Sequence, residues 1–181
     1  EGQVGLLKTD PHCKLVIIGD GPDAGDYKEL ARKLRVQDSV IFTGKVPWEE
    51  VPKYYQLADV FATASRTETQ GLTVIEAMAA SVPVVAADDD SFRNVVIDDL
   101  NGYLFANKKE YKKYVRKLMG DPNLKKRMSD QARISAEPHS AKYFAEKVLD
   151  VYQTALEGSG AHKRNFFGKA KDVVKKGFYG K

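Results

Sequence analysis

The chain has 181 residues, 43% of them hydrophobic, so it can bury one sizeable core and is expected to form one main domain. No apolar run approaches the 18 residues of a membrane-spanning helix. The formal net charge is +4, but residues 159–181 hold seven basic residues and one acid, which leaves residues 1–158 at about −2. A nucleic-acid-binding domain normally carries its basic stripe on the folded body, so this distribution argues against nucleic acid as a partner.

Short apolar runs alternate with helical periodicity through the first half of the chain. Residues 14–19 and 39–44 have the length and composition of buried parallel strands, with a helix expected between them. Pro47 is expected to open the next helix, because proline is favoured in the first turn. A third strand at residues 60–64 and a helix at residues 72–81 follow.

The same alternation continues in the second half. We expect a strand at residues 82–87, a helical turn at 91–97 and a short strand at 103–105. Three helices follow, of which Pro122 begins the second and the third ends before Gly158. Strands alternating with helices predict an α/β fold with a doubly wound parallel sheet, followed by C-terminal helices. Residues 1–158 would form this domain.

Two glutamates eight positions apart bracket a glycine at the start of the expected 72–81 helix. Glu68 falls on the loop after the third strand, and Glu76 falls one turn inside the helix. In open parallel sheets this edge binds ligands, and the amides of Gly71, Leu72 and Thr73 would be free to hold a phosphate anion. The two carboxylates could accept hydrogen bonds from sugar hydroxyls. By spacing alone, they could equally be ordinary acids near a helix start.

The stretch ETQGLTVIEAMAA, residues 68–80, resembles the signature of retaining GT-B glycosyltransferases of the family 4, or group 1, type. It is most similar to the bacterial branch that glucosylates diacylglycerol. The resemblance implies a Rossmann-like donor-binding half that serves a hexosyltransferase moving glucose from UDP-glucose to a lipid. It also implies a further strand carrying an Arg and a Lys for the diphosphate, and an N-terminal acceptor domain. Neither is found in residues 1–156, so we expect a fragment that binds the donor weakly and transfers nothing alone.

The resemblance also assigns roles to individual residues. Glu68 would contact the donor sugar and position its anomeric carbon, as the catalytic candidate. Glu76 would accept hydrogen bonds from the ribose, and Val46 would lie against the nucleobase. The residues holding the phosphates would be Gly71, Leu72 and Thr73. For Val46, an ordinary turn with backbone freedom at Gly44 explains the sequence equally well.

A dinucleotide-binding fingerprint is formally present at residues 19–24, GDGPDA, after the first strand. It supports one alternative function, an NAD-dependent oxidoreductase. That fold needs an acid about 20 residues on to bind the ribose, and the second strand ends instead in Thr43-Gly44-Lys45. Pro22 also removes an amide donor from the loop. Both features argue against the oxidoreductase.

Three consecutive acids, Asp88, Asp89 and Asp90, could suggest a metal site. Three neighbours along a chain cannot all face one ion, and no His or Glu ligand is obvious nearby. The resemblance also implies catalysis without a metal, because the helix dipole and basic side chains neutralise the leaving diphosphate. We therefore expect no metal and no cofactor.

Residues 159–181 form a basic tail with an amphipathic pattern. On a helix, its apolar residues cover an arc of roughly 140°, with most basic residues opposite. The candidates for membrane contact are Phe166, Phe167, Lys169, Lys171, Lys175 and Lys176. Such a segment can bind an anionic membrane surface, or it can dock on the absent N-terminal domain. The first possibility leaves open a second alternative function, a non-catalytic α/β binding or membrane-adaptor module.

The lone Cys13 excludes an internal disulfide and fits a reducing compartment. With no spanning helix expected, the sequence predicts a cytoplasmic protein. The tail adds the possibility of a peripheral position on the inner face of the cell membrane.

Overall fold

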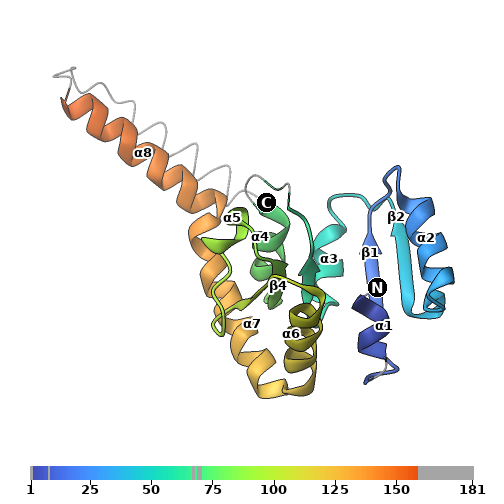
Figure 1. Cartoon of the computed structure of the whole chain (residues 1–181). Coiled ribbons are helices and arrows are strands. Elements are labelled where there is room, and N and C mark those ends of the chain that lie inside the picture. Colours follow the sequence, from blue (N-terminus) through green and yellow to red (C-terminus); the bar gives the residue numbers. More distant parts are fainter. Residues whose placement is uncertain (1, 8, 67, 69–70, 159–181) are drawn as a thin grey trace. The chain divides into compact units, whose positions relative to one another are not determined.

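The computed structural model describes residues 2–7, 9–66, 68 and 71–158 (Figure 1). The chain divides into two compact units, Glu1–Ser135 and Ala136–Lys181. The expected tail, residues 159–181, lies outside the described residues, and with it the membrane-contact candidates, including Phe166 and Lys176.

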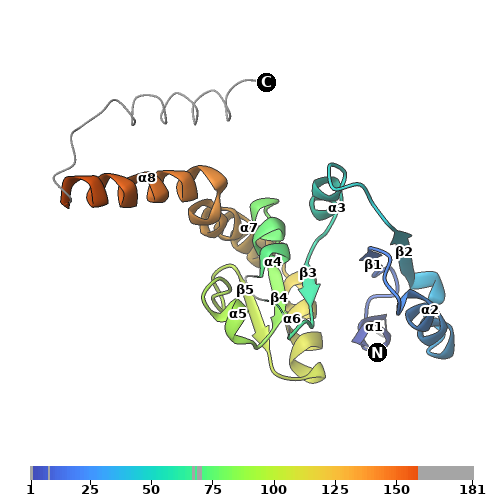
Figure 2. The same ribbon diagram turned by 90° about the horizontal axis from the view of Figure 1, so that it is seen from above.

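Five parallel strands form two sheets in the first unit. Their bounds are β1 Leu15–Ile18, β2 Val40–Gly44, β3 Phe61–Thr63, β4 Val84–Ala87 and β5 Gly102–Phe105. One sheet pairs β1 with β2, and the other has the order β3-β4-β5, which Figure 2 shows from above. All five strands occur where the sequence predicts them, and the α/β class is confirmed. The parallel pairing places the carboxyl ends of neighbouring strands at one edge of each sheet.

Helices connect the strands, as parallel pairing requires. The connecting helices are α2 Ala24–Lys33, η1 Gln37–Ser39, α3 Val51–Gln56, α4 Leu72–Ala79 and α5 Asp90–Arg93. Helix α1 Gly2–Leu7 precedes β1, and α6 Lys108–Gly120 and α7 Pro122–Ala136 follow β5. The helix expected at Pro47 begins only at Val51, because residues 47–50 form a turn in which the Glu50 amide donates to the Pro47 carbonyl at 2.9 Å. The following Pro52 then occupies the first turn of α3, where it costs no hydrogen bond.

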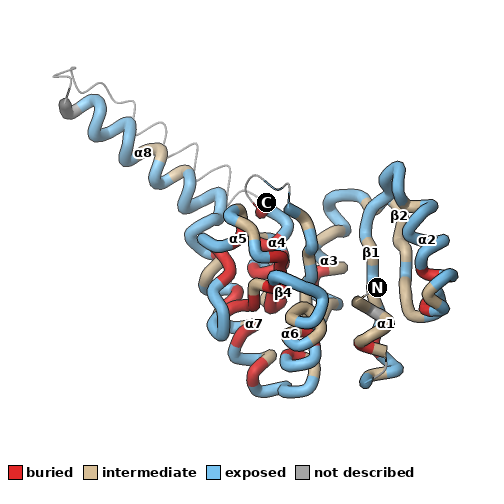
Figure 3. Tube along the Cα trace, in the orientation of Figure 1, coloured by how far each residue is buried: buried red, intermediate tan, exposed pale blue. Residues whose placement is uncertain are grey.

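The core surrounds β4, all four of whose residues are buried (Figure 3). Val85 and Ala87 belong to a cluster that includes Leu118 of α6 and Met128 of α7, each with no exposed surface. Successive strand residues point to opposite faces, so burial of the whole strand means that both faces are covered. This strand lies beside β3, whose end carries the candidate site.

Helix α1 was not expected from the sequence. Its Leu6 is buried in the same core cluster, and the Arg116 guanidinium of α6 donates to the Gly5 carbonyl at 2.5 Å. Packing on α6 therefore stabilises a segment whose two glycines disfavour a helix.

The second unit contains η2 Glu137–His139 and α8 Ala141–Gly158. Helix α8 confirms the last expected helix. Its apolar side chains are largely exposed, with Phe144 at 70% and Val151 at 69%. Within the described part of the chain, the helices are too short or too polar to cross a bilayer.

Candidate functional site

The candidate site lies where β3 runs into α4. The turn after the strand is held by the Ser65 amide, which donates to the Thr63 hydroxyl at 3.2 Å. Glu68 follows and is exposed, and its neighbours at 67 and 69–70 lie outside the described residues. The structure therefore places Glu68 on the loop at the carboxyl end of the sheet, as the sequence predicts.

Gly71 caps the start of α4 in a left-handed conformation, with φ of +61°. Its carbonyl accepts the first hydrogen bonds of the helix, from Val74 at 2.9 Å and Ile75 at 3.2 Å. The amides of Leu72 and Thr73 precede those bonds, so they point out of the helix end without intrahelical acceptors. A side chain at position 71 would press on the Phe92 ring, at 3.1 Å from Cδ1. Glycine thus meets both a backbone and a packing requirement at this position.

The first residues of α4 are exposed. Leu72 is 58% exposed and Thr73 is also exposed. Among the described residues, no side chain caps the helix and no acid occupies its first turn. The helix dipole adds partial positive charge at this end, so the free amides can bind a phosphate group.

Glu76 lies one turn into α4 and is an exposed residue. Its Oε2 accepts a hydrogen bond from the Tyr55 hydroxyl of α3 at 3.0 Å. Burial of Tyr55, that hydrogen bond and the charge of Glu76 all raise the pKa of the Tyr55 phenol, so it stays a neutral donor. Tyr55 falls in the helix that the sequence predicts after Pro47, but no sequence pattern identifies its hydroxyl as a partner of Glu76.

Val46 lies apart from the α4 residues along the chain, in the loop after β2, and is half-buried. It precedes α3, whose Tyr55 contacts Glu76, so α3 connects the two segments. The structure thus gathers Gly71, Leu72, Thr73 and Glu76 on α4 and adds Tyr55 to them. The Val46 side chain is a hydrocarbon, so no hydrogen bond joins it to this group.

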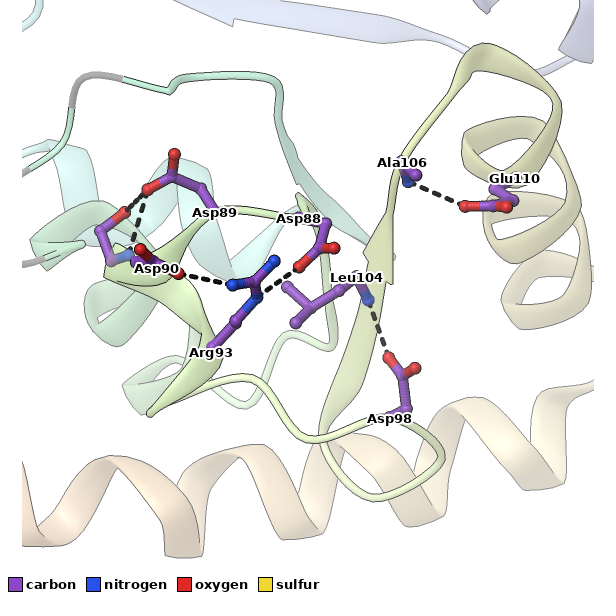
Figure 4. Close-up of polar contacts among 9 residues, drawn as sticks. Asp88, Asp89, Asp90, Arg93, Asp98, Leu104, Ala106 and Glu110 are labelled. Carbon is purple, nitrogen blue, oxygen red and sulfur yellow. Dashed lines mark hydrogen bonds and ion pairs between the residues drawn. The ribbon is translucent and has the colours of Figure 1, made fainter.

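The Asp88–Asp90 triplet is occupied by other interactions (Figure 4). Arg93 donates to Asp88 at 2.8 Å and to Asp90 at 2.5 Å, and the bond to Arg93 lowers the pKa of Asp88. The Asp89 carboxylate accepts from the Ser91 amide at 3.1 Å and thereby caps α5. The described residues contain no group of three or more His, Cys, Asp or Glu able to hold a metal ion. Metal-free catalysis remains a prediction.

The glycine loop after β1 also has an internal role. The Gly19 amide donates to the Gly44 carbonyl at 3.0 Å, and Gly19 has a φ of +118°. The loop therefore joins the ends of β1 and β2. Its first glycine amide is already paired and is not offered to a pyrophosphate, so the geometry does not favour the oxidoreductase alternative.

A model of the family described as "Glycosyl transferases group 1" matches residues 4–135. The chain belongs to this family. The Alpha-monoglucosyldiacylglycerol synthase of Acholeplasma laidlawii is 37% identical over 157 residues, which are 87% of this chain and 39% of that protein. The chain thus spans well under half the length of this relative.

Solved structures agree with the fold. The C-terminal domain of the group 1 glycosyl transferase LpcC from Francisella tularensis superposes with a TM-score of 0.67 at 27% identity, covering 74% of this chain and 73% of that one. S. aureus TarM, in a structure containing UDP, gives a TM-score of 0.75 at 25% identity, covering 83% of this chain and 31% of that one. The predicted family and the Rossmann-like architecture are confirmed.

Proposed function

We propose that this chain is the donor-binding half of a retaining glycosyltransferase that moves glucose from UDP-glucose to diacylglycerol. The observation that carries the proposal is the N-terminus of α4, which no side chain caps among the described residues, with the exposed residue Glu76 one turn away. A UDP-sugar needs an anion site beside acceptors for its hydroxyls, and this arrangement offers both. The acceptor follows from the name of the Acholeplasma relative, a monoglucosyldiacylglycerol synthase.

Each candidate residue has a distinct part in this proposal. The amides of Leu72 and Thr73 hold the diphosphate and stabilise the charge that develops as UDP leaves, which lowers the barrier to transfer. Glu76 accepts hydrogen bonds from the ribose. Glu68, on the exposed loop, accepts from the sugar hydroxyls and positions the anomeric carbon, and Val46 lies against the base.

Calorimetric titration of the 181-residue chain with UDP tests this assignment. We expect weak binding that Glu76→Ala weakens by about tenfold or more, because a hydrogen bond to a charged group contributes about 1.5–3 kcal/mol. Glu146→Ala is the matched control, since Glu146 is an exposed glutamate on α8, in the other unit. Uridine should bind more weakly than UDP, because it has no phosphate to bind the amides at the N-terminus of α4. No measurable binding of UDP, or equal binding by Glu76→Ala and the parent, would refute the assignment.

We also propose a peripheral position at the inner face of the membrane, where the lipid acceptor lies. The composition of the tail supports it, with seven basic residues and one acid in residues 159–181. The chain should co-sediment with anionic vesicles and not with zwitterionic ones, and exchanging Lys175 and Lys176 for Glu should reduce the binding. Vesicle binding without any UDP binding would favour the membrane-adaptor alternative.

A further inference from the structure

Tyr55 is the one described side chain that hydrogen-bonds Glu76. The two residues are 21 positions apart, on α3 and α4, and the hydroxyl donates to Oε2 at 3.0 Å. Among the described residues, no cation forms an ion pair with Glu76, and its Oε1 accepts no hydrogen bond. One carboxylate oxygen of Glu76 is therefore left to accept hydrogen bonds from a ligand.

The ring of Tyr55 is a fixed support for this bond. Only 8% of the residue is exposed, and its ring lies edge-on to Phe61 of β3, with centroids 5.6 Å apart and planes at 61°. A buried aromatic ring has little rotational freedom, whereas an exposed glutamate samples several rotamers. The hydrogen bond from the fixed Tyr55 hydroxyl therefore restricts the Glu76 carboxylate to fewer orientations.

We propose that Tyr55 is a positioning residue that holds Glu76 ready for the nucleotide ribose. The inference rests on the proposed function, because it takes the ribose as the ligand of Glu76. A carboxylate that is already oriented loses less conformational entropy when a ligand binds, so preorganisation raises affinity. Since the restraint acts only through Glu76, it should raise the affinity only of ligands whose hydroxyls donate hydrogen bonds to Glu76.

Tyr55→Phe and Tyr54→Phe form a matched pair for the test. Tyr55→Phe keeps the ring against Phe61 and removes only the hydroxyl. Tyr54, adjacent on α3, is half-buried and forms none of the described hydrogen bonds. The proteins titrated calorimetrically would be the 181-residue parent, both variants, Glu76→Ala and the double variant of Tyr55→Phe with Glu76→Ala. The ligands would be UDP, 2′-deoxy-UDP and 3′-deoxy-UDP, and circular dichroism would check that each protein is folded.

We expect Tyr55→Phe to weaken UDP binding about three- to tenfold, the value of one lost hydrogen bond. For the deoxy analogue that lacks the hydroxyl bound by Glu76, the loss should be less than about twofold, because the restraint no longer matters there. Tyr54→Phe should bind all three ligands as the parent does. The double variant of Tyr55→Phe with Glu76→Ala should bind UDP with the same affinity as Glu76→Ala alone.

Four results would overturn the inference. Equal UDP affinity in Tyr55→Phe and the parent would show that Glu76 needs no support. Equal losses for UDP and both deoxy analogues, or a misfolded Tyr55→Phe, would mean that Tyr55 serves the packing of α3 and not the ribose. In these three cases the effect of Glu76→Ala would leave the proposed function standing. Failure of the parent to bind UDP would remove the proposed function and the inference together.

Discussion

Gly71→Ala should disrupt the start of α4. Gly71 has a φ of +61°, which costs an L-residue about 1–2 kcal/mol. The new Cβ would also lie 3.1 Å and 3.2 Å from two carbons of the Phe92 ring and 3.4 Å from the Ser91 carbonyl oxygen. Phe92 has no exposed surface, so its ring has little room to move away.

Overpacking of this kind costs about 1–3 kcal/mol, and the stiffer unfolded chain returns about 0.4–1 kcal/mol. The net loss in the free energy of unfolding should be about 1–5 kcal/mol. For a chain of this length, that loss lowers Tm by about 2–20 °C. Because a displaced Gly71 would also displace the amides of Leu72 and Thr73, the affinity for UDP should fall as well.

Urea denaturation followed by circular dichroism measures the stability, and calorimetry measures UDP binding. Gly25→Ala is the matched control, because Gly25 lies in α2 and an added Cβ meets no described atom within 4 Å. That control should be neutral or more stable by up to about 1 kcal/mol. If Gly71→Ala proves as stable as Gly25→Ala and binds UDP normally, the left-handed cap and its contact with Phe92 do not constrain the site as described.

Two further predictions concern a buried amide and the alkaline limit of stability. Asn101 is fully buried; its side chain donates to the Val95 carbonyl at 3.0 Å and accepts from the Ile97 amide at 2.8 Å. Asn101→Leu should therefore lower the free energy of unfolding, measured by urea denaturation, by about 2–4 kcal/mol, whereas the control Asn94→Leu, at an exposed position, should change it by less than about 0.5 kcal/mol. Equal urea midpoints for the two variants would contradict the role of the buried amide. Folding raises the pKa of Tyr55, so the stability that its neutral phenol contributes is complete below the ordinary tyrosine pKa of about 10 and is lost as the pH rises above it. The urea midpoint should therefore fall less between about pH 8 and about pH 10.5 in Tyr55→Phe than in the parent, and parallel pH curves would contradict the shift.

Local sequence was sufficient for most of the fold. The apolar runs of β1 to β5 and the helical periodicity between them predicted all five strands and the α/β class, because these signals depend on neighbours along the chain. The E-x7-E spacing around Gly71 also predicted which residues would share the start of α4. Its glycine encodes the left-handed cap directly, since other residues resist that conformation.

Only the tertiary structure decided which distant side chains meet. Helix α1 forms although its glycines disfavour it, because Leu6 enters the core and Arg116 bonds the Gly5 carbonyl. The contact between Tyr55 and Glu76 depends on how α3 packs beside α4, and no pattern within either helix encodes that arrangement. Backbone preferences act over a few residues and can be predicted from the sequence, whereas side-chain packing depends on the whole core. The support for Glu76 therefore became visible only in the folded chain.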